Sequence, residues 1–141
     1  MRWLALDVGS RRVGVAVCDD AESVATPLAA LVYSRPEALA AAAAELVRTW
    51  DAGGVVVGVP VTRSGAGRGE ARVAGVVAAL ALRVAVPVET VDERGTTAAA
   101  QALLSEAGVP RRRWPELVDS LAARLILDAH LANRRRAASR R

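Results

Sequence analysis

Hydrophobic and polar positions along this chain form short apolar runs and longer segments with a helical repeat. Five apolar runs have the length and composition of β-strands: residues 2–8, 12–18, 29–33, 54–60 and 86–93. The first two are separated only by Gly9-Ser10-Arg11, which predicts an antiparallel hairpin. The run 54–60, GVVVGVP, is apolar throughout and is therefore typical of a parallel strand that is buried on both faces.

Four further segments predict helices: 35–50, 70–83, 97–107 and 115–133. Pro36 suits the first turn of the first helix, whose interior is mostly Ala, and Thr96 or Thr97 is expected to N-cap the third. The order is three strands, then helix, strand, helix, strand and two helices. It predicts an α/β fold whose mixed central sheet has three antiparallel strands followed by parallel strands, with helices on both faces.

The composition is that of a single domain with a core of small side chains. Hydrophobic residues make up 52% of the 141 residues, aromatics only 3%, and the chain has neither Phe nor Lys. The net charge of +4 is concentrated in residues 134–141, which hold five Arg and no acid. We therefore expect one domain over 1–133 and a disordered Arg-rich tail over 134–141. Such a tail suits nucleic-acid binding, but it suits a solubilising role equally well.

Cysteine use and hydropathy predict a soluble, cytoplasmic protein. Cys18 is the single cysteine, so no internal disulfide can form, and we expect it to be a small buried side chain. The first residues do not resemble a signal peptide because Asp7 interrupts the apolar stretch. No run of ~18 uncharged apolar residues suggests a membrane span.

Acidic residues stand in apolar surroundings at three places. Asp7 closes the first strand, Asp92 and Glu93 end the last strand, and Asp119 lies in the last helix. Each has an ordinary explanation, because Asp7 could cap the hairpin turn, Asp92 or Glu93 could pair with Arg94, and Asp119 could cap an irregular helix start. Strand ends of one sheet lie close together, however, so the acids of three separate elements are expected to converge there.

The position of Asp119 on its helix favours this convergence. At ~100° per residue, Asp119 shares one face with three apolar residues that are expected to pack on the sheet, Ala122, Ala123 and Ile126. Asp128 differs because it follows Arg124 by one turn, so an exposed i,i+4 ion pair explains it.

Converging carboxylates repel one another unless they are protonated or bridged by cations. Oxygen ligands alone select hard cations such as Mg²⁺ or Mn²⁺. Two such ions activate a water and stabilise the leaving oxygen of a phosphodiester. The candidate metal ligands are therefore Asp7, Asp119 and one or both of Asp92 and Glu93.

Arginines near these acids are candidate phosphate contacts: Arg11, Arg12, Arg63, Arg68 and Arg94. As solvated loop charges they would be equally ordinary. With no Phe and one Tyr, we expect no aromatic platform for stacking bases, so nucleic acid would be held by its backbone or its shape.

Four blocks of the sequence together resemble one family. LALDVGSRRVGVAVCD, VVVGVPVTRSG, VDERGTT and VDSLAARLIL match, in order and spacing, the signature blocks of the YqgF/RuvX family of RNase H-like nucleases, described as Holliday junction resolvases or pre-16S rRNA nucleases. The resemblance covers the chain up to the Arg tail. It implies an RNase H-like fold and a Mg²⁺- or Mn²⁺-dependent site built from Asp7, Glu93 and Asp119. It also implies branched DNA or precursor rRNA as the partner, with a homodimer as one possible assembly.

Two other functions remain open from the sequence. The chain could be a non-catalytic module that binds nucleic acid or assists ribosome assembly. The stretch DVGSRRVGVAV also resembles the phosphate-binding hairpin of actin-like ATPases, but these proteins need two such lobes, and 141 residues provide one.

Overall fold

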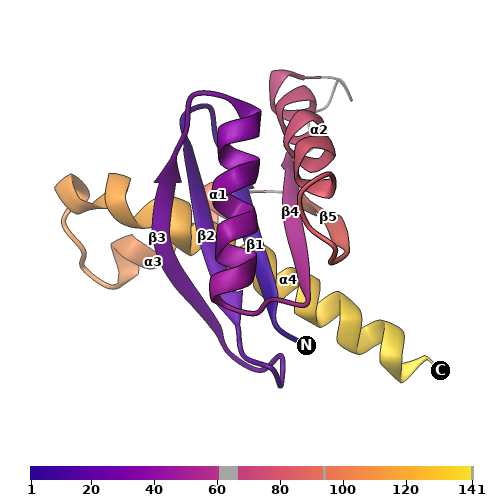
Figure 1. The fold of residues 1–141 in the computed structure, drawn as a ribbon. Helices are drawn as coiled ribbons and strands as arrows, with labels where there is room; N and C mark the ends of the chain where they lie inside the picture. The colour runs from indigo at the N-terminus through magenta and orange to yellow at the C-terminus, as the bar shows by residue number, and fades with distance from the viewer. Residues whose placement is uncertain (61–66, 94, 141) are drawn as a thin grey trace.

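Helices cover both faces of a five-stranded sheet (Figure 1). The structure is a computed structural model that describes residues 1–60, 67–93 and 95–140. The elements are β1 (Trp3–Val8), β2 (Arg12–Cys18), β3 (Ala25–Val32), α1 (Pro36–Thr49), β4 (Gly54–Pro60), α2 (Arg68–Ala81), β5 (Val88–Glu93), α3 (Thr96–Glu106), the short 3-10 helix η1 (Arg111–Arg113) and α4 (Trp114–Ser139).

The strand order is β3-β2-β1-β4-β5. β1, β2 and β3 pair antiparallel, while β4 pairs parallel with β1 and β5 parallel with β4. The predicted mixed sheet is therefore confirmed. β1 lies at its centre, so Asp7 belongs to the most enclosed strand of the molecule.

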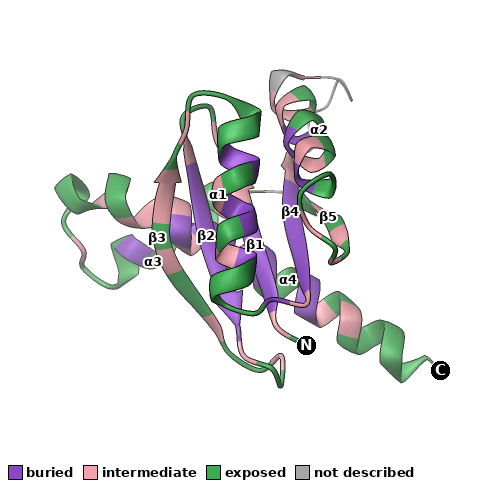
Figure 2. Cartoon of the chain, viewed as in Figure 1, coloured by how far each residue is buried: buried purple, intermediate pink, exposed green. Residues whose placement is uncertain are grey.

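Side chains alternate between two cores, one on each face of the sheet. One face packs against α1 and α2 through Val and Leu side chains such as Leu4, Leu6 and Val57. The other face packs against α4 and carries smaller residues, with Ala5, Ala16 and Ala123 among them. Figure 2 shows the central strands buried and the outer surfaces of the helices exposed. Asp7 follows Ala5 by two residues and so lies on the α4 face.

Some predicted boundaries need correction. The third strand is longer than the predicted 29–33, because it begins at Ala25. Pro27 lies within it, which is tolerated because β3 is an edge strand and needs no N–H on its outer side. Helix α3 begins at Thr96 with Gly95 at the N-cap and without a side-chain capping bond, so the predicted Thr cap is wrong.

Helix α4 is also longer than predicted. It continues to Ser139, so residues 134–139, expected as part of a disordered tail, are helical. In Figure 1 its C-terminal part extends beyond the sheet, while its first half crosses behind β2 and β3. None of the helices in the described ranges combines the length and apolarity that crossing a membrane requires.

Candidate active site

Asp7 lies between two glycines on the face of the sheet that α4 covers. It pairs with Gly14 of β2, and one residue past the Leu6–Val57 pair, its neighbour on β4 is Gly58. Neither neighbour has a side chain on this face, so space remains around the Asp7 carboxylate for groups from other elements. The Asp7 side chain therefore has no neighbouring side chain from β2 or β4 beside it.

Helix α4 brings Asp119 to this space. A Cβ atom on Gly14 would overlap the backbone carbonyl of Asp119, so the helix lies directly against the β2 backbone at this point. Ser120 Oγ donates a hydrogen bond of 2.5 Å to the carbonyl of Leu28 in β3. Ala122 and Ala123, both fully buried, allow the close approach. The predicted sheet-facing side of the helix is thus confirmed.

Glu93 reaches the same face from the end of β5. A Cβ atom on Gly58 would lie 3.6 Å from the Glu93 Cβ and would overlap the end of the Ile126 side chain. The Thr96 hydroxyl, at the first position of α3, donates a hydrogen bond to Glu93 Oε1. Asp92 precedes Glu93 by one residue, so it points to the opposite face of β5 and is exposed. The structure therefore places Asp7, Glu93 and Asp119 on one face of the sheet, within electrostatic range of Asp7, and Asp92 on the other face.

The carboxylates influence one another electrostatically. Burial raises the pKa of Asp7 from 3.8 to about 7, and the negative charges of Glu93 and then Asp119 contribute further to this rise. Ionisation of Asp7 is therefore costly, and a cation beside it would remove that cost.

In this conformation Asp119 has a cationic partner. Arg12 Nη2 lies 2.7 Å from Asp119 Oδ2, with both side chains partly exposed. Within the described residues, no three carboxylate, imidazole or thiolate groups gather closely enough to hold one ion among them. The three carboxylates nevertheless supply oxygen ligands only, which is the donor set that suits Mg²⁺ and Mn²⁺.

A cavity of about 570 Å³ adjoins Asp119, and we call it the Trp114 cavity. Its wall comes from the β1–β2 turn, from α3, from η1 and from the start of α4: Gly9, Ser10, Arg11, Arg12, Gln101, Arg111, Trp114, Pro115, Val118 and Asp119. The turn is held in place by the Tyr33 hydroxyl, which donates to the carbonyl of Gly9 at 2.6 Å. Two of the predicted phosphate contacts, Arg11 and Arg12, thus line a cavity beside the carboxylates.

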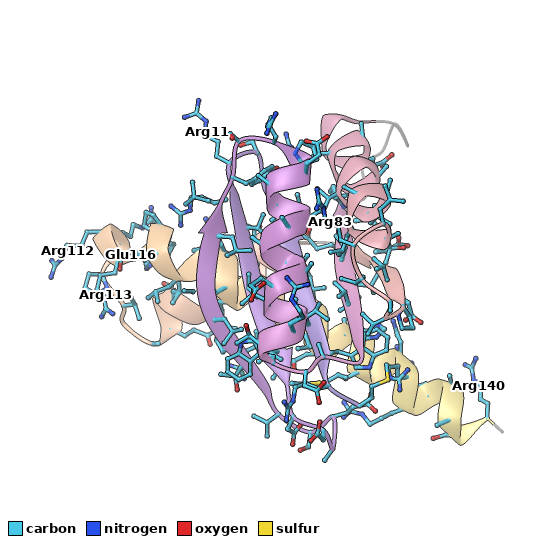
Figure 3. All side chains as sticks on the ribbon, in the orientation of Figure 1. Arg11, Arg83, Arg112, Arg113, Glu116 and Arg140 are labelled. Carbon is cyan, nitrogen blue, oxygen red and sulfur yellow. The ribbon has the colours of Figure 1, made fainter. Side chains whose placement is uncertain are left out.

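Sequence reasoning missed Arg111 and Trp114 as site residues. The Arg111 guanidinium lies 5.0 Å from the centre of the Trp114 ring, whose Nε1 donates to the carbonyl of Val109 at 2.9 Å. The run RRRW ahead of the last helix is a basic segment followed by an aromatic residue, and this pattern could have indicated both residues from the sequence. Figure 3 shows Arg112 and Arg113 pointing outward at this end of α4 and Arg11 pointing outward from the hairpin.

The remaining predicted residues lie in varied places. Arg63 and Arg94 fall outside the described residues, as does the side chain of Arg68, whose backbone opens α2. Cys18 is buried and accepts a hydrogen bond from the backbone N–H of Trp3, as befits the predicted small core side chain. Asp128 Oδ2 lies 3.9 Å from Arg124 Nε, which confirms the expected ion pair outside the site.

Comparison with known proteins places this geometry in context. The family described as "RuvX: Holliday junction resolvase" matches residues 1–133. A relative from Desulforudis audaxviator (strain MP104C) is 40% identical over 136 residues and covers 96% of each chain. A relative from Anaeromyxobacter sp. (strain Fw109-5) is 39% identical over 135 residues and covers 95% of this chain and 98% of its own. Both are named "Putative pre-16S rRNA nuclease".

Two solved structures resemble the fold. Thermus thermophilus RuvC in complex with a Holliday junction substrate has a TM-score of 0.60 at 18% identity and covers 95% of each chain. The fowlpox virus Holliday junction resolvase has a TM-score of 0.53 at 10% identity, over 92% of this chain and 96% of that chain. At such identities the likeness concerns the fold, and it confirms the RNase H-like architecture.

Proposed function

We propose an activity for this chain from one premise: the chain belongs to the RuvX family, described as Holliday junction resolvase. The chain is a nuclease that hydrolyses phosphodiester bonds in structured nucleic acid. The observation that supports the assignment of its site is that Asp7, Glu93 and Asp119 come from three separate elements to one face of the sheet, where the charges of Glu93 and Asp119 act on Asp7.

The cofactor in this proposal is a divalent cation, Mg²⁺ or Mn²⁺, with two ions as the expected number. Asp7, Glu93 and Asp119 would hold it, because carboxylate oxygens are the ligands these ions prefer. When bound, such ions activate a water molecule and stabilise the leaving oxygen of the phosphodiester.

The chain's own residues then have distinct roles. Asp7 is fixed on the central strand, Glu93 is held by the Thr96 hydroxyl, and Asp119 is set by the contact of α4 with Gly14. Arg12 and Asp119 form an ion pair in the wall of the Trp114 cavity, so the guanidinium can hold either that carboxylate or a substrate phosphate.

Two substrates are consistent with the proposal: a branched DNA such as a Holliday junction or flap, and the 5′ end of precursor 16S rRNA. The family description supports the first, and the names of the relatives support the second. Symmetrical cutting of two junction strands would require two copies of the chain, so a dimer is expected on the junction and not on the rRNA.

The decisive experiment is a cleavage panel of junction, flap, single-stranded DNA and precursor 16S rRNA with Mg²⁺ and with Mn²⁺. Wild type should cut at least one substrate, and Asp119→Asn should not. Asp128→Asn is the matched control, because it removes a carboxylate from the same helix outside the site. Absence of cleavage on every substrate, or equal loss in both variants, would contradict the proposal.

One observation favours a second candidate function, a non-catalytic nucleic-acid-binding or ribosome-assembly module. Asp119 is engaged by Arg12 in this conformation, and no three metal-ligating groups of the described residues gather around one point. Such a module would bind its nucleic acid equally well as wild type and as Asp7→Asn, and it would cut nothing in the same panel.

A further inference from the structure

The Trp114 cavity combines an apolar wall with a basic rim. Trp114, Pro115 and Val118 come from the first turns of α4 and supply the apolar side. Arg11 and Arg111 stand at the rim and are exposed, and Gln101 of α3 adds an amide that can donate and accept hydrogen bonds. Flat apolar surface, cationic groups and one amide match the chemistry of a nucleotide, which has a planar base, a phosphate and polar edges.

Trp114 and Arg111 form a ready stacking surface. The guanidinium lies 5.0 Å from the ring centre, within the range of a cation–π contact, and the indole N–H bond to Val109 fixes the ring. Unpaired bases stack both on aromatic rings and on guanidinium planes, so this pair offers either kind of surface. The expectation that the chain lacks an aromatic platform rests on Phe and Tyr alone, and the proposal below departs from it by using Trp114.

The cavity is continuous with the proposed catalytic carboxylates. Asp119 belongs both to its wall and to the group around Asp7, and its charge is balanced there by Arg12. The other charged side chains of the wall, Arg11 and Arg111, are cationic and have no acidic partner in it. A ligand that fits this charge distribution is anionic and extends from the carboxylates into the cavity.

We propose that the Trp114 cavity binds one unpaired nucleotide of the substrate, with its base stacked on the Arg111–Trp114 pair and its phosphate held by Arg11. This inference rests on the proposed nuclease function and makes it more specific. It gives a reason for preferring substrates with an unpaired nucleotide beside the cleavage site, such as a flap, a branch point or a single-stranded rRNA end, over a continuous duplex.

The test compares Trp114→Leu with Trp114→Phe. Both lose the hydrogen bond to Val109, but only Phe keeps an aromatic face, so their difference isolates stacking. We expect Trp114→Leu to weaken binding of a flap oligonucleotide roughly 5- to 100-fold, as loss of one base–aromatic stack does, and Trp114→Phe to recover most of it. Trp50→Leu is the control, because Trp50 lies at the opposite end of β1 from the cavity. Trp50 follows α1, and its backbone carbonyl accepts a hydrogen bond from Arg2.

A second arm uses the substrate. Replacing the unpaired nucleotide by an abasic unit, scanned one position at a time, should weaken wild-type binding by a similar factor at one position. The same replacement should have no further effect in Trp114→Leu. If base removal weakens binding by the same factor in wild type and in Trp114→Leu, or if neither change affects binding, the nucleotide subsite is refuted.

Binding is measured in the Asp7→Asn background, by the fluorescence anisotropy of dye-labelled flap and blunt duplex oligonucleotides, a signal that does not depend on the tryptophans of the protein. This separates the two proposals. Cleavage by wild type without any effect of Trp114 or of the base would remove the subsite and leave the nuclease. Base-dependent binding without cleavage under any condition would leave the subsite and remove the nuclease. A protein or small molecule as the true occupant would give no base-dependent binding, and this also refutes the subsite.

Discussion

At the level of single residues, Asp7 ionises at a cost to the folded state. Its pKa is about 7 in the folded chain and 3.8 in the reference state, because of burial and the charges of Glu93 and Asp119. Between pH 4 and pH 7 the folded chain therefore binds more protons at this group than the unfolded chain does. In this window the contribution of Asp7 to stability falls as pH rises, and above pH 7 the cost stays constant.

This gives a prediction for Asp7→Asn in metal-free buffer. The neutral amide avoids the cost of ionisation, so the variant should be more stable than wild type above pH 7, by ~1–3 kcal/mol after allowing for partial solvation of the carboxylate. The two proteins should converge near pH 4. Thermal denaturation with a chelator at several pH values measures the difference. A constant difference across the range would mean that Asp7 does not titrate as its surroundings indicate.

A second prediction compares the cleavage rates of variants at two neighbouring acids, Glu93 and Asp92. Glu93→Gln should lower cleavage by ~100-fold or more, since even groups that only support metal ligands cost 10- to 100-fold. Asp92→Asn should keep activity near that of wild type because its side chain points to the opposite face of β5. Initial rates at saturating Mn²⁺ decide the matter, and a large loss in Asp92→Asn would mean that this acid also serves the site.

At the level of elements, the close contact of α4 with β2 at Gly14 positions Asp119. Gly14→Ala should push the helix away and overpack the interface, at a cost of ~1–3 kcal/mol or more, with a large loss of cleavage. Gly75→Ala is the control, because a Cβ there meets nothing within 4 Å in the middle of α2. It should stabilise the chain by ~0.5–1 kcal/mol through helix propensity. Urea unfolding and cleavage rates test both, and a neutral Gly14→Ala would remove Gly14 from the argument.

The sequence predicted most elements because their patterns are local. β2 and β4 have the predicted bounds, and the face of Asp119 follows from helical spacing. The hydrophobic pattern alone did not decide between Asp92 and Glu93, since the edge strand β5 carries Val88 and Val91 on opposite faces and its alternation gives no direction. The family resemblance favoured Glu93. The Trp114 cavity could not be foreseen either, because the β1–β2 turn, which is distant in sequence, meets α3, η1 and α4 to form it.

At the level of the whole molecule, the arginines of α4 divide into two groups. Arg134 belongs to the fold: its Nε lies 2.6 Å from Glu22 Oε1, and its guanidinium lies 4.9 Å from the centre of the Trp3 ring. This hydrogen bond lowers the pKa of Glu22 and raises that of Arg134. Arg135 also contacts Glu22, because its Nη1 donates to the carbonyl of Glu22 at 3.5 Å. Arg136 follows on the part of the helix that extends beyond the sheet, and Figure 3 shows the C-cap residue Arg140 at its far end.

The two groups should therefore respond differently to removal. Arg134→Ala should lower stability by ~1–2 kcal/mol through loss of the ion pair and the cation–π interaction. Truncation after Arg135 should leave the melting temperature unchanged, because the hydrogen bonds that it removes lie within the end of the helix. It should reduce the dependence of binding on salt, by up to ~0.9 in the log–log slope for each duplex phosphate that the shortened chain no longer neutralises. Substrate length sharpens this test, because Arg136 follows Asp119 by 17 residues on α4, which at about 1.5 Å each extend roughly 26 Å. This is about 8 base pairs at about 3.4 Å each, so a substrate held at the carboxylates must be at least that long to reach the extension. Truncation should consequently weaken the binding of long substrates and leave the binding of short substrates unaffected. An equal effect on both would show that the arginines do not contact the nucleic acid along α4.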